Sequence, residues 1–201
     1  MKFYTMPEVN FNSILENVNR HIKLEKEESD FFISLLQHRL LNRKEFLLRQ
    51  GEICRKETFI VKGCLRVYTT DENGAEHVVI FGVENWWVGD FASFITQTPA
   101  TYYIDALEDT EVLQITKEDL ERLYEKVHKF ERFFRLLLQN AYAAQQNRIN
   151  QNLAFTAEQR YLDFIKKYPQ LEQRISQKQV SSYLGITPVF LSMIRRKLMG
   201  K

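Results

Sequence analysis

The chain has 201 residues, of which 44% are hydrophobic and 13% aromatic, and its 28 Lys and Arg nearly balance its 26 Asp and Glu. This composition excludes an intrinsically disordered chain and supplies enough apolar residues for one large core or two modest domains. Two cysteines, Cys54 and Cys64, and four scattered histidines form neither a disulfide framework nor the ligand spacing of a zinc or iron–sulfur site. We therefore expect no metal, no cofactor and no catalytic centre.

Membrane-spanning and leader segments are not expected either. No apolar run approaches the roughly 18 residues that a membrane-spanning helix needs, and the polar segment Glu8 to Asn12 directly follows Lys2 to Pro7. The sequence therefore predicts a soluble, cytoplasmic protein without a membrane partner.

The segment from Phe11 to Leu41 has helical spacing. Ile14 and Val18 lie four residues apart, and a second apolar group follows at Phe31, Phe32, Leu35 and Leu36. This pattern predicts two short helices.

From Glu45 to Ile115 the pattern changes to short apolar or alternating runs separated by glycines. The runs cover residues 46–48, 58–61, 64–70 and 77–81. Asn73-Gly74 between two of them is a strong hairpin signal, because these residues accept the positive φ of a tight turn. Many short strands with regular spacing predict a barrel or jelly roll.

Helical periodicity returns at Thr116, which can cap a helix together with Asp119, and it continues for about forty residues. This connector carries more apolar side chains than one barrel face needs, and they are Phe130, Phe133, Phe134, Leu137, Leu138, Ala141, Ala144, Ile149 and Leu153. We expect the surplus to pair with a second subunit, although packing on the barrel would explain part of it. The polar band at residues 145–147 and 150–152 is a hinge, an effector contact or a hydrated helix face.

The last stretch, from Ile175 to Lys201, has the pattern of a helix-turn-helix. Ser176 and Gln179 form a capping box, Gly185 can end the first helix in the left-handed conformation, and Thr187 with Pro188 starts a second helix. Leu191, Ile194 and Leu198 form its inward stripe, which leaves the polar side chains to solvent or phosphate.

Charge separates this tail from the rest of the chain. Residues 160–201 hold nine Lys or Arg and two acids, whereas the total formal charge of the chain is only +2. An acidic body with a basic tail is typical of a protein that neutralises phosphates at one end, so we favour DNA binding over a merely solvated basic face.

The order of these elements resembles the CRP/FNR family of bacterial transcription regulators, over nearly the whole chain. Three segments carry the resemblance, at residues 50–67, 106–112 and 175–198. The short C-terminus and the Ile-Thr-Pro start of the second helix are similar to a subgroup common in Bacteroidetes. The resemblance implies an α+β fold in which residues 1–115 form a jelly-roll, cyclic-nucleotide-binding-like effector domain with N-terminal helices. Residues 116–154 would be the connector and dimerisation helix, and 155–201 the DNA-binding domain without a full wing, since only three residues follow Leu198.

The resemblance also places the family's phosphate-binding cassette between Val88 and Tyr103. Asp90 stands where the family has a ribose-binding Glu, Ala100 falls at the position of the phosphate-binding Arg, and Tyr102 replaces a small Ala. Without that Arg a buried phosphate has no charged, bidentate partner, so we expect cyclic AMP not to be the effector. The tyrosines, together with nearby Trp86, Trp87, Phe91 and Phe94, either fill a hydrophobic core or line a pocket for a different, more apolar ligand. The effector-pocket candidates are Gly89, Asp90, Phe91, Ala92, Ala100, Thr101, Tyr102, Tyr103, Gln146 and Asn147.

In the DNA-binding element, the positions where relatives often carry Arg and Glu hold Pro188, Val189 and Met193. Bidentate reading of guanine is impossible for these side chains, but Val189 and Met193 can contact thymine methyl groups and Ser192 can donate to a base edge. Arg195, Arg196 and Lys197 are expected to bind phosphates, so that affinity depends on the DNA backbone and shape. The DNA-binding candidates are Ser176, Gln177, Lys178, Thr187, Val189, Ser192, Met193, Arg195, Arg196 and Lys197.

The leading hypothesis is a homodimeric, DNA-binding transcription regulator with an unidentified effector, and with RNA polymerase as a further candidate partner. A second hypothesis is a small-molecule-binding or interaction module that has lost sequence-specific DNA reading. A jelly-roll metalloenzyme is disfavoured, because His77 alone cannot supply a metal site.

Overall fold

The computed structural model describes residues 9–169 and 171–200. Within them, eight strands form two antiparallel four-stranded sheets that face each other as a sandwich. One sheet has the order β1-β8-β3-β6 and the other β2-β7-β4-β5. The strands of the first sheet are β1 Gln37–Leu41, β8 Thr110–Thr116, β3 Lys56–Lys62 and β6 Trp87–Val88. Those of the second are β2 Phe46–Leu48, β7 Tyr103–Ala106, β4 Leu65–Thr70 and β5 Glu76–Gly82. The predicted jelly-roll region is confirmed.

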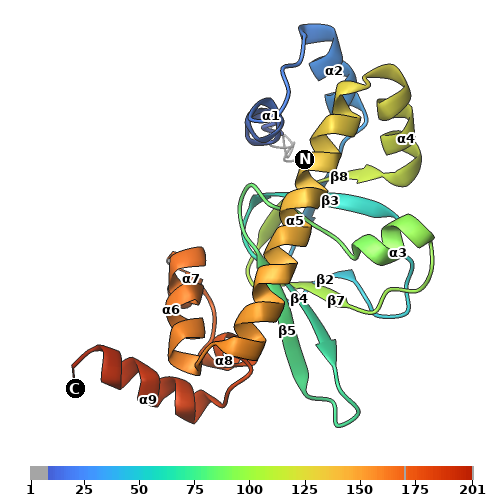
Figure 1. The fold of residues 1–201 in the computed structure, drawn as a ribbon. Coiled ribbons are helices and arrows are strands. Elements are labelled where there is room, and N and C mark those ends of the chain that lie inside the picture. Colours follow the sequence, from blue (N-terminus) through green and yellow to red (C-terminus); the bar gives the residue numbers. More distant parts are fainter. Residues whose placement is uncertain (1–8, 170, 201) are drawn as a thin grey trace, which may run out of the picture.

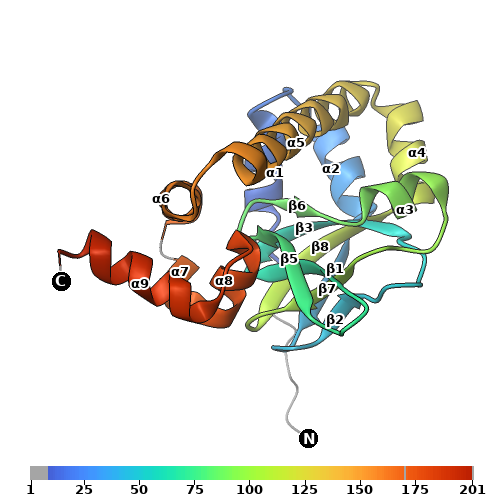
Figure 2. The same ribbon diagram turned by 60° about the horizontal axis from the view of Figure 1, so that its bottom comes forward.

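The N-terminal segment forms two helices, as its spacing predicts, at α1 Asn12–Asn19 and α2 Lys26–Ser34. The predicted helical segment is wrong beyond Leu36, however, because Gln37–Leu41 is strand β1 and pairs with β8. Pairing with a neighbouring strand outweighs the local pattern there. Figure 2 shows α1, α2 and the later helices α4 Lys117–Lys126 and α5 Lys129–Ala154 covering the β1-β8-β3-β6 sheet.

The hairpin between β4 and β5 turns at the predicted Asn73-Gly74. Gly74 has a φ of +77°, and the Asp71 side chain accepts hydrogen bonds from the Asn73 and Ala75 amides, both at 2.9 Å. The turn is therefore held by its own Asp side chain, as Asx turns are.

The connector is two helices, and the expectation of one helix of about forty residues is wrong. Thr116 does cap α4, accepting from the Asp119 amide at 3.0 Å, but α4 ends at Lys126 and α5 starts at Lys129. Val127 between them is buried and leaves the helical conformation, with φ −132° and ψ 76°. The break lets Phe130 and Phe133 pack into the barrel-side core with α2.

Helix α5 runs along the barrel, and the C-terminal helices gather at its far end (Figure 1). They are α6 Ala157–Lys167, α7 Leu171–Arg174, α8 Gln177–Leu184 and α9 Pro188–Leu198. A second core cluster joins them to the second sheet, and its central residue is Phe81 of β5, which contacts Phe164, Tyr168 and Tyr183. The C-terminal helices are therefore docked on the edge of the barrel.

No helix of the described residues combines the length and apolar character that crossing a bilayer requires.

Candidate functional site

The α8–α9 pair has the geometry that its sequence predicts. Ser176 caps α8, with its hydroxyl accepting from the Gln179 amide at 3.3 Å and the Gln179 side chain accepting from the Ser176 amide at 2.8 Å. Gly185 ends the helix with a φ of +66°. Thr187 then caps α9 by accepting from the Phe190 amide at 3.2 Å, and Pro188 occupies the first helical position. The capping box, the glycine turn and the proline start are confirmed.

The outer face of α9 is open to solvent at its N-terminal half. Val189 is 71% exposed and Met193 is 53% exposed, while Leu191 and Ile194 are buried against α8 and α6. The predicted inward stripe is wrong at its last member, since Leu198 is exposed. The reason is length: α9 has 11 residues and outruns α8, which has eight.

Two of the predicted DNA-binding residues hold the helix pair together. Gln177, at the start of α8, donates from its side-chain amide to the Pro188 carbonyl at 2.8 Å and to the Ser192 hydroxyl. The Ser192 hydroxyl in turn donates to the Pro188 carbonyl at 3.1 Å. The hydroxyl proton of Ser192 is therefore engaged inside the helix pair and is not free to meet a base edge.

The three cations at the end of α9 differ in their surroundings. Arg195 is half-buried, pairs with Glu172 at 2.5 Å and donates to the Tyr161 hydroxyl at 3.2 Å. Lys197 pairs with Glu158 of α6. Arg196 is exposed and belongs to none of the ion pairs formed within residues 9–169 and 171–200. Arg195 and Lys197 thus tie α9 to α6 and α7, whereas Arg196 points its charge at solvent.

One further cation and two capping residues are exposed next to the outer face of α9. Lys178, in the first turn of α8, is exposed, as are the capping residues Ser176 and Thr187. The structure therefore brings the predicted DNA-binding residues together on one helix pair. One group faces solvent without a partner in the described residues, namely Lys178, Val189, Met193 and Arg196. The other group is bonded to protein partners, namely Gln177, Ser192, Arg195 and, at the surface, Lys197.

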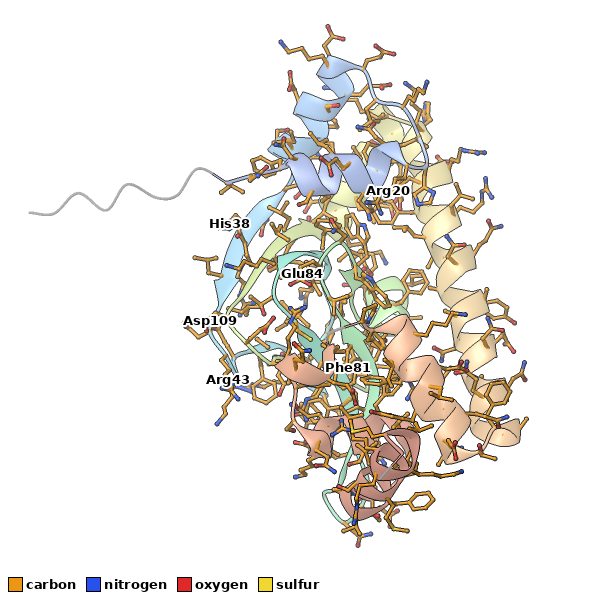
Figure 3. All side chains as sticks on the ribbon, turned by 90° about the vertical axis from the view of Figure 1, so that its left-hand side faces the viewer. Arg20, His38, Arg43, Phe81, Glu84 and Asp109 are labelled. Atoms are coloured by element: carbon orange, nitrogen blue, oxygen red, sulfur yellow. The ribbon has the colours of Figure 1, made fainter. Side chains whose placement is uncertain are left out.

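Helix α8 is fixed to the barrel by specific polar contacts as well as by the core cluster around Phe81. Ser182 donates to the Glu76 carbonyl at 2.6 Å and accepts from the Val78 amide at 3.0 Å, which covers the open edge of β5. Nearby, Arg174 pairs with Glu84 at 2.7 Å and with Glu108. Figure 3 shows Phe81 and Glu84 where the C-terminal helices meet the barrel.

The cassette between β6 and β7 is organised by Asp90. Its carboxylate caps helix α3 Phe91–Thr96 by accepting from the Ser93 amide at 3.1 Å, and it also accepts from the Thr101 amide at 2.9 Å. Asp90 is only 2% exposed. Its two oxygens are thus used to tie the beginning of the cassette to its end.

The other cassette candidates do not converge on one cavity. Phe91, Ala92 and Thr101 are exposed, and Ala100 is buried with both its amide and its carbonyl bonded to the loop at Gly51 and Glu52. Tyr102 packs against the barrel-side core, whereas Tyr103 stacks on Tyr68 at a centroid distance of 5.2 Å. Gln146 and Asn147 are exposed on α5 and line no cavity of the barrel.

The barrel itself holds a small cavity of about 180 Å³. Of the predicted effector residues only Gly89 lines it. Its other polar walls include Arg39, Thr58 and Gln114, and the Gln114 side chain donates to the Thr58 hydroxyl at 3.1 Å. Sequence reasoning missed these residues, although alternate positions of β3 and β8 carry polar side chains toward one face, a pattern that could have flagged them.

A buried carboxyl lies directly behind the cassette. Glu57 of β3 has one side-chain oxygen without a hydrogen-bond partner, and a Cβ on Gly89 would lie 3.2 Å from its carboxylate. Burial, together with the negative charge of Asp90, raises the pKa of Glu57 to about 7. Glu57 therefore leaves little room for a side chain at position 89.

The two cysteines are buried, and burial raises the pKa of the Cys54 thiol to about 11 and that of Cys64 to about 12. They are packing residues and not reactive thiols. No group of three or more His, Cys, Asp or Glu in the described ranges has the arrangement of a metal site.

Comparison with known proteins agrees with this architecture. Residues 38–127 match the family model of the cyclic nucleotide-binding domain. A comparison with curated protein sequences gives no match. Among solved structures, the regulator CLP of Xanthomonas campestris, described as responsive to c-di-GMP, has a TM-score of 0.69 at 15% identity, over 88% of this chain and 92% of that one.

Two further structures share the fold. A double mutant of CooA from Carboxydothermus hydrogenoformans has a TM-score of 0.70 at 18% identity and covers 96% of this chain and 86% of its own. A protein from Eubacterium rectale described as a transcriptional regulator of the CRP/FNR family has a TM-score of 0.67 at 14% identity, over 88% of this chain and 84% of that one. The chain therefore has the fold of CRP/FNR regulators: a cyclic-nucleotide-binding sandwich, a long helix and a helical C-terminal region.

Proposed function

We propose that this protein is a homodimeric, DNA-binding transcription regulator of the CRP/FNR type, acting in the cytoplasm. The observation that carries the proposal is the capped α8–α9 pair, whose second helix presents an open N-terminal half next to exposed cations. A helix-turn-helix places the N-terminal residues of its second helix against base edges in the major groove. The proposal rests on this geometry and on the basic C-terminal segment.

The exposed surface of α9 suits apolar contacts with the methyl groups of thymine bases and recognition of DNA shape. Val189 and Met193 are apolar and lie one turn apart on the open face, so both can reach the same side of the groove. Arg196 and Lys178 are the exposed cations best placed for backbone phosphates. Because Arg195 and Lys197 already have carboxylate partners, we expect them to contribute less.

Helix α5 supplies a face for a second subunit. Tyr142 is 68% exposed and Leu153 is 82% exposed, and Leu138 and Ile149 continue the same stripe along the helix. A row of large apolar side chains at four- and seven-residue spacing on a surface helix is typical of a helix–helix seam. Pairing α5 with its copy would bury this row and place two α9 helices side by side for two DNA half-sites.

The effector is proposed to be something other than cyclic AMP. Ala100 offers no charge to a cyclic phosphate, and Asp90 is already bonded to two backbone amides. The barrel cavity, at about 180 Å³, is also smaller than the roughly 300 Å³ at which small-molecule sites usually begin. A barrel effector must therefore be small, or the cavity must enlarge to admit it.

Binding-site selection with the purified full chain tests the proposal. We expect enrichment of duplexes with two inverted half-sites about one helical turn apart. Sedimentation should give a dimer that Tyr142→Lys converts to a monomer, while the exposed control Lys23→Gln stays dimeric. The selection could also yield no preferred duplex, with an affinity for DNA that depends on the salt concentration and not on the sequence. That result would favour the alternative, a ligand-binding module without specific DNA reading.

A further inference from the structure

A cavity of about 340 Å³ lies where the end of α5, helix α6 and the end of α8 meet. It is separate from the barrel cavity and shares no lining residue with it. Seven of its ten lining residues are polar or charged, and the other three are Phe164, Tyr183 and Leu184. It lies at the junction between the long helix and the C-terminal helices.

The charges around this cavity are unbalanced. Four cations line it, Arg148, Arg160, Lys166 and Lys167, against one carboxylate, Asp163. Asp163 is itself engaged, since it accepts a hydrogen bond from the Gln151 side chain at 2.9 Å. Among the ion pairs formed within the described ranges, none includes any of the four cations. The cavity therefore concentrates positive charge that the protein does not neutralise.

Two of the cations, Arg160 and Lys167, also make contacts inside the protein, and Lys167 lies over the Trp86 and Tyr168 rings. The Nε atom of Arg160 is buried without a hydrogen-bond partner, although Nη1 of the same side chain donates to the Phe155 carbonyl at 3.0 Å. This Nε atom has almost no accessible surface, so it does not face the open cavity, and Arg160 would bind a ligand through its other guanidinium N–H groups. Burial lowers the pKa of Lys167, and the positive charge of Arg148 lowers it further.

Arg148 gives the cavity a fixed wall. Its guanidinium lies 3.8 Å from the centroid of the Tyr183 ring, and Nη2 donates to the Val78 carbonyl at 3.1 Å and to the Tyr183 carbonyl at 3.0 Å. These contacts hold α5, β5 and α8 together at this point. An arginine has five N–H donors, so Arg148 keeps donors for a ligand as well.

The cavity is not part of the surface proposed for DNA. Tyr183 and Leu184 stand at the C-terminal end of α8, whereas Ser176, Gln177 and Lys178 stand at its start. An eight-residue helix separates its ends by about 10 Å. A duplex seated on the start of α8 and on α9 therefore meets a different end of the helix.

We propose that this cavity binds a small phosphate-bearing anion, as inorganic phosphate or as the phosphate of a small ester. Phosphate oxygens accept several hydrogen bonds and suit guanidinium donors, so one such group would bind the arginines that line the cavity and offset the charges of the two lysines. The volume lies within the range of small-molecule sites. Because the walls come from α5, α6 and α8, the bound anion would fix the C-terminal helices relative to the long helix.

Isothermal titration of the full chain with inorganic phosphate, adenosine 5′-monophosphate and adenosine, at constant ionic strength set with chloride, tests the proposal. Phosphate and the monophosphate should bind saturably and adenosine should not. Arg160→Gln should weaken binding at least tenfold and Lys166→Gln, at an exposed position that leaves the fold intact, severalfold, while Lys23→Gln leaves it unchanged. Absence of saturable binding, or equal affinity in wild type and Arg160→Gln, would overturn the proposal.

Two further readouts separate this site from DNA binding. Phosphate should slow hydrogen exchange of the Val78 amide and of α8 in wild type and not in Arg160→Gln, whether or not the protein binds any DNA sequence. An excess of duplex DNA should leave phosphate binding unchanged. Displacement of phosphate by the duplex would show that these cations belong to the DNA surface and would contradict a separate anion site.

Discussion

The cassette of the barrel and the α8–α9 pair differ in how their polar side chains are used. In the cassette, Asp90 stands at the position proposed for ligand binding, but it is buried and accepts hydrogen bonds from backbone amides at both ends of the loop. In the helix pair, the capping residues are also bonded to backbone, yet the outer face of α9 stays open. A side chain that is buried and fully bonded maintains the fold, and one that remains exposed on a rigid helix is available to a partner.

This contrast predicts that barrel-side substitutions change stability and that α9 substitutions change binding. Substitutions in both regions test that separation.

Phe81→Ala removes the ring at the centre of the cluster between β5 and the C-terminal helices. Loss of a buried phenylalanine costs about 3 to 5 kcal/mol of stability. Urea unfolding should show this loss, and the C-terminal helices should exchange amide protons faster than the barrel. Val189→Ala, at an exposed position of α9, should change the free energy of unfolding by less than about 0.5 kcal/mol. Equal effects of the two substitutions would contradict the separation.

Glu57→Gln should stabilise the protein at high pH. The pKa of folded Glu57 is raised from 4.5 to about 7, so the carboxyl is neutral at low pH, and the cost of ionising it grows as the pH rises through this range. The substitution removes that cost, worth about 3 kcal/mol at pH 8 and under about 1 kcal/mol near pH 5. Unfolding at the two pH values measures it, with exposed Glu125→Gln as control. A gain that does not depend on pH would show that burial of the charge is not the cause.

Asp90→Ala removes the acceptor for the Ser93 and Thr101 amides. Loss of a helix cap costs about 0.5 to 2 kcal/mol, and the buried position places this one at the upper end. Thermal unfolding measures the change, and Asp109→Ala, at an exposed acidic position, should have a smaller effect. If Asp90→Ala kept full stability and lost response to a ligand instead, the cassette would be a binding site.

Arg196→Gln and Lys197→Gln remove two neighbouring cations of α9 that differ in their protein partners. Arg196 is free to reach a phosphate, so its loss should weaken binding to the selected duplex and reduce the slope of log affinity against log salt by about one. Lys197 is paired with Glu158, and its loss should change the slope less. Fluorescence anisotropy over a salt series measures both. A larger change of slope for Lys197→Gln than for Arg196→Gln would show that the Lys197–Glu158 ion pair breaks when DNA binds.

The sequence predicts the helix caps and turns of this fold better than the features that depend on long-range contacts. The Ser176 and Thr187 caps, the left-handed Gly185 and the Asn73-Gly74 turn depend on neighbouring residues, and each is found as expected. Strand β1 and the break at Val127 depend on partners far along the chain, namely β8 and the core around Phe130, and both were missed.

The same limit applies to the candidate sites. Spacing identifies Arg195, Lys197 and Ser192 as members of the DNA-binding surface, but it cannot reveal that Glu172, Glu158 and Gln177 already engage them. Those partners come from other helices, so only the packed structure brings them together. The anion cavity is a further case, because Arg148 comes from α5 and the other three cations come from α6, and only the packing of the two helices brings them to one cavity.

The most direct test of the central claim is the affinity of a Val189→Glu/Met193→Glu double variant for the selected duplex, measured by fluorescence anisotropy at fixed salt. Both positions are exposed, so unfolding and sedimentation should match wild type. We expect specific binding to fall at least a hundredfold, because two carboxylates would stand where bases and phosphates must approach. Unchanged specific affinity in the folded variant would contradict the assignment of α9 as the helix that binds DNA.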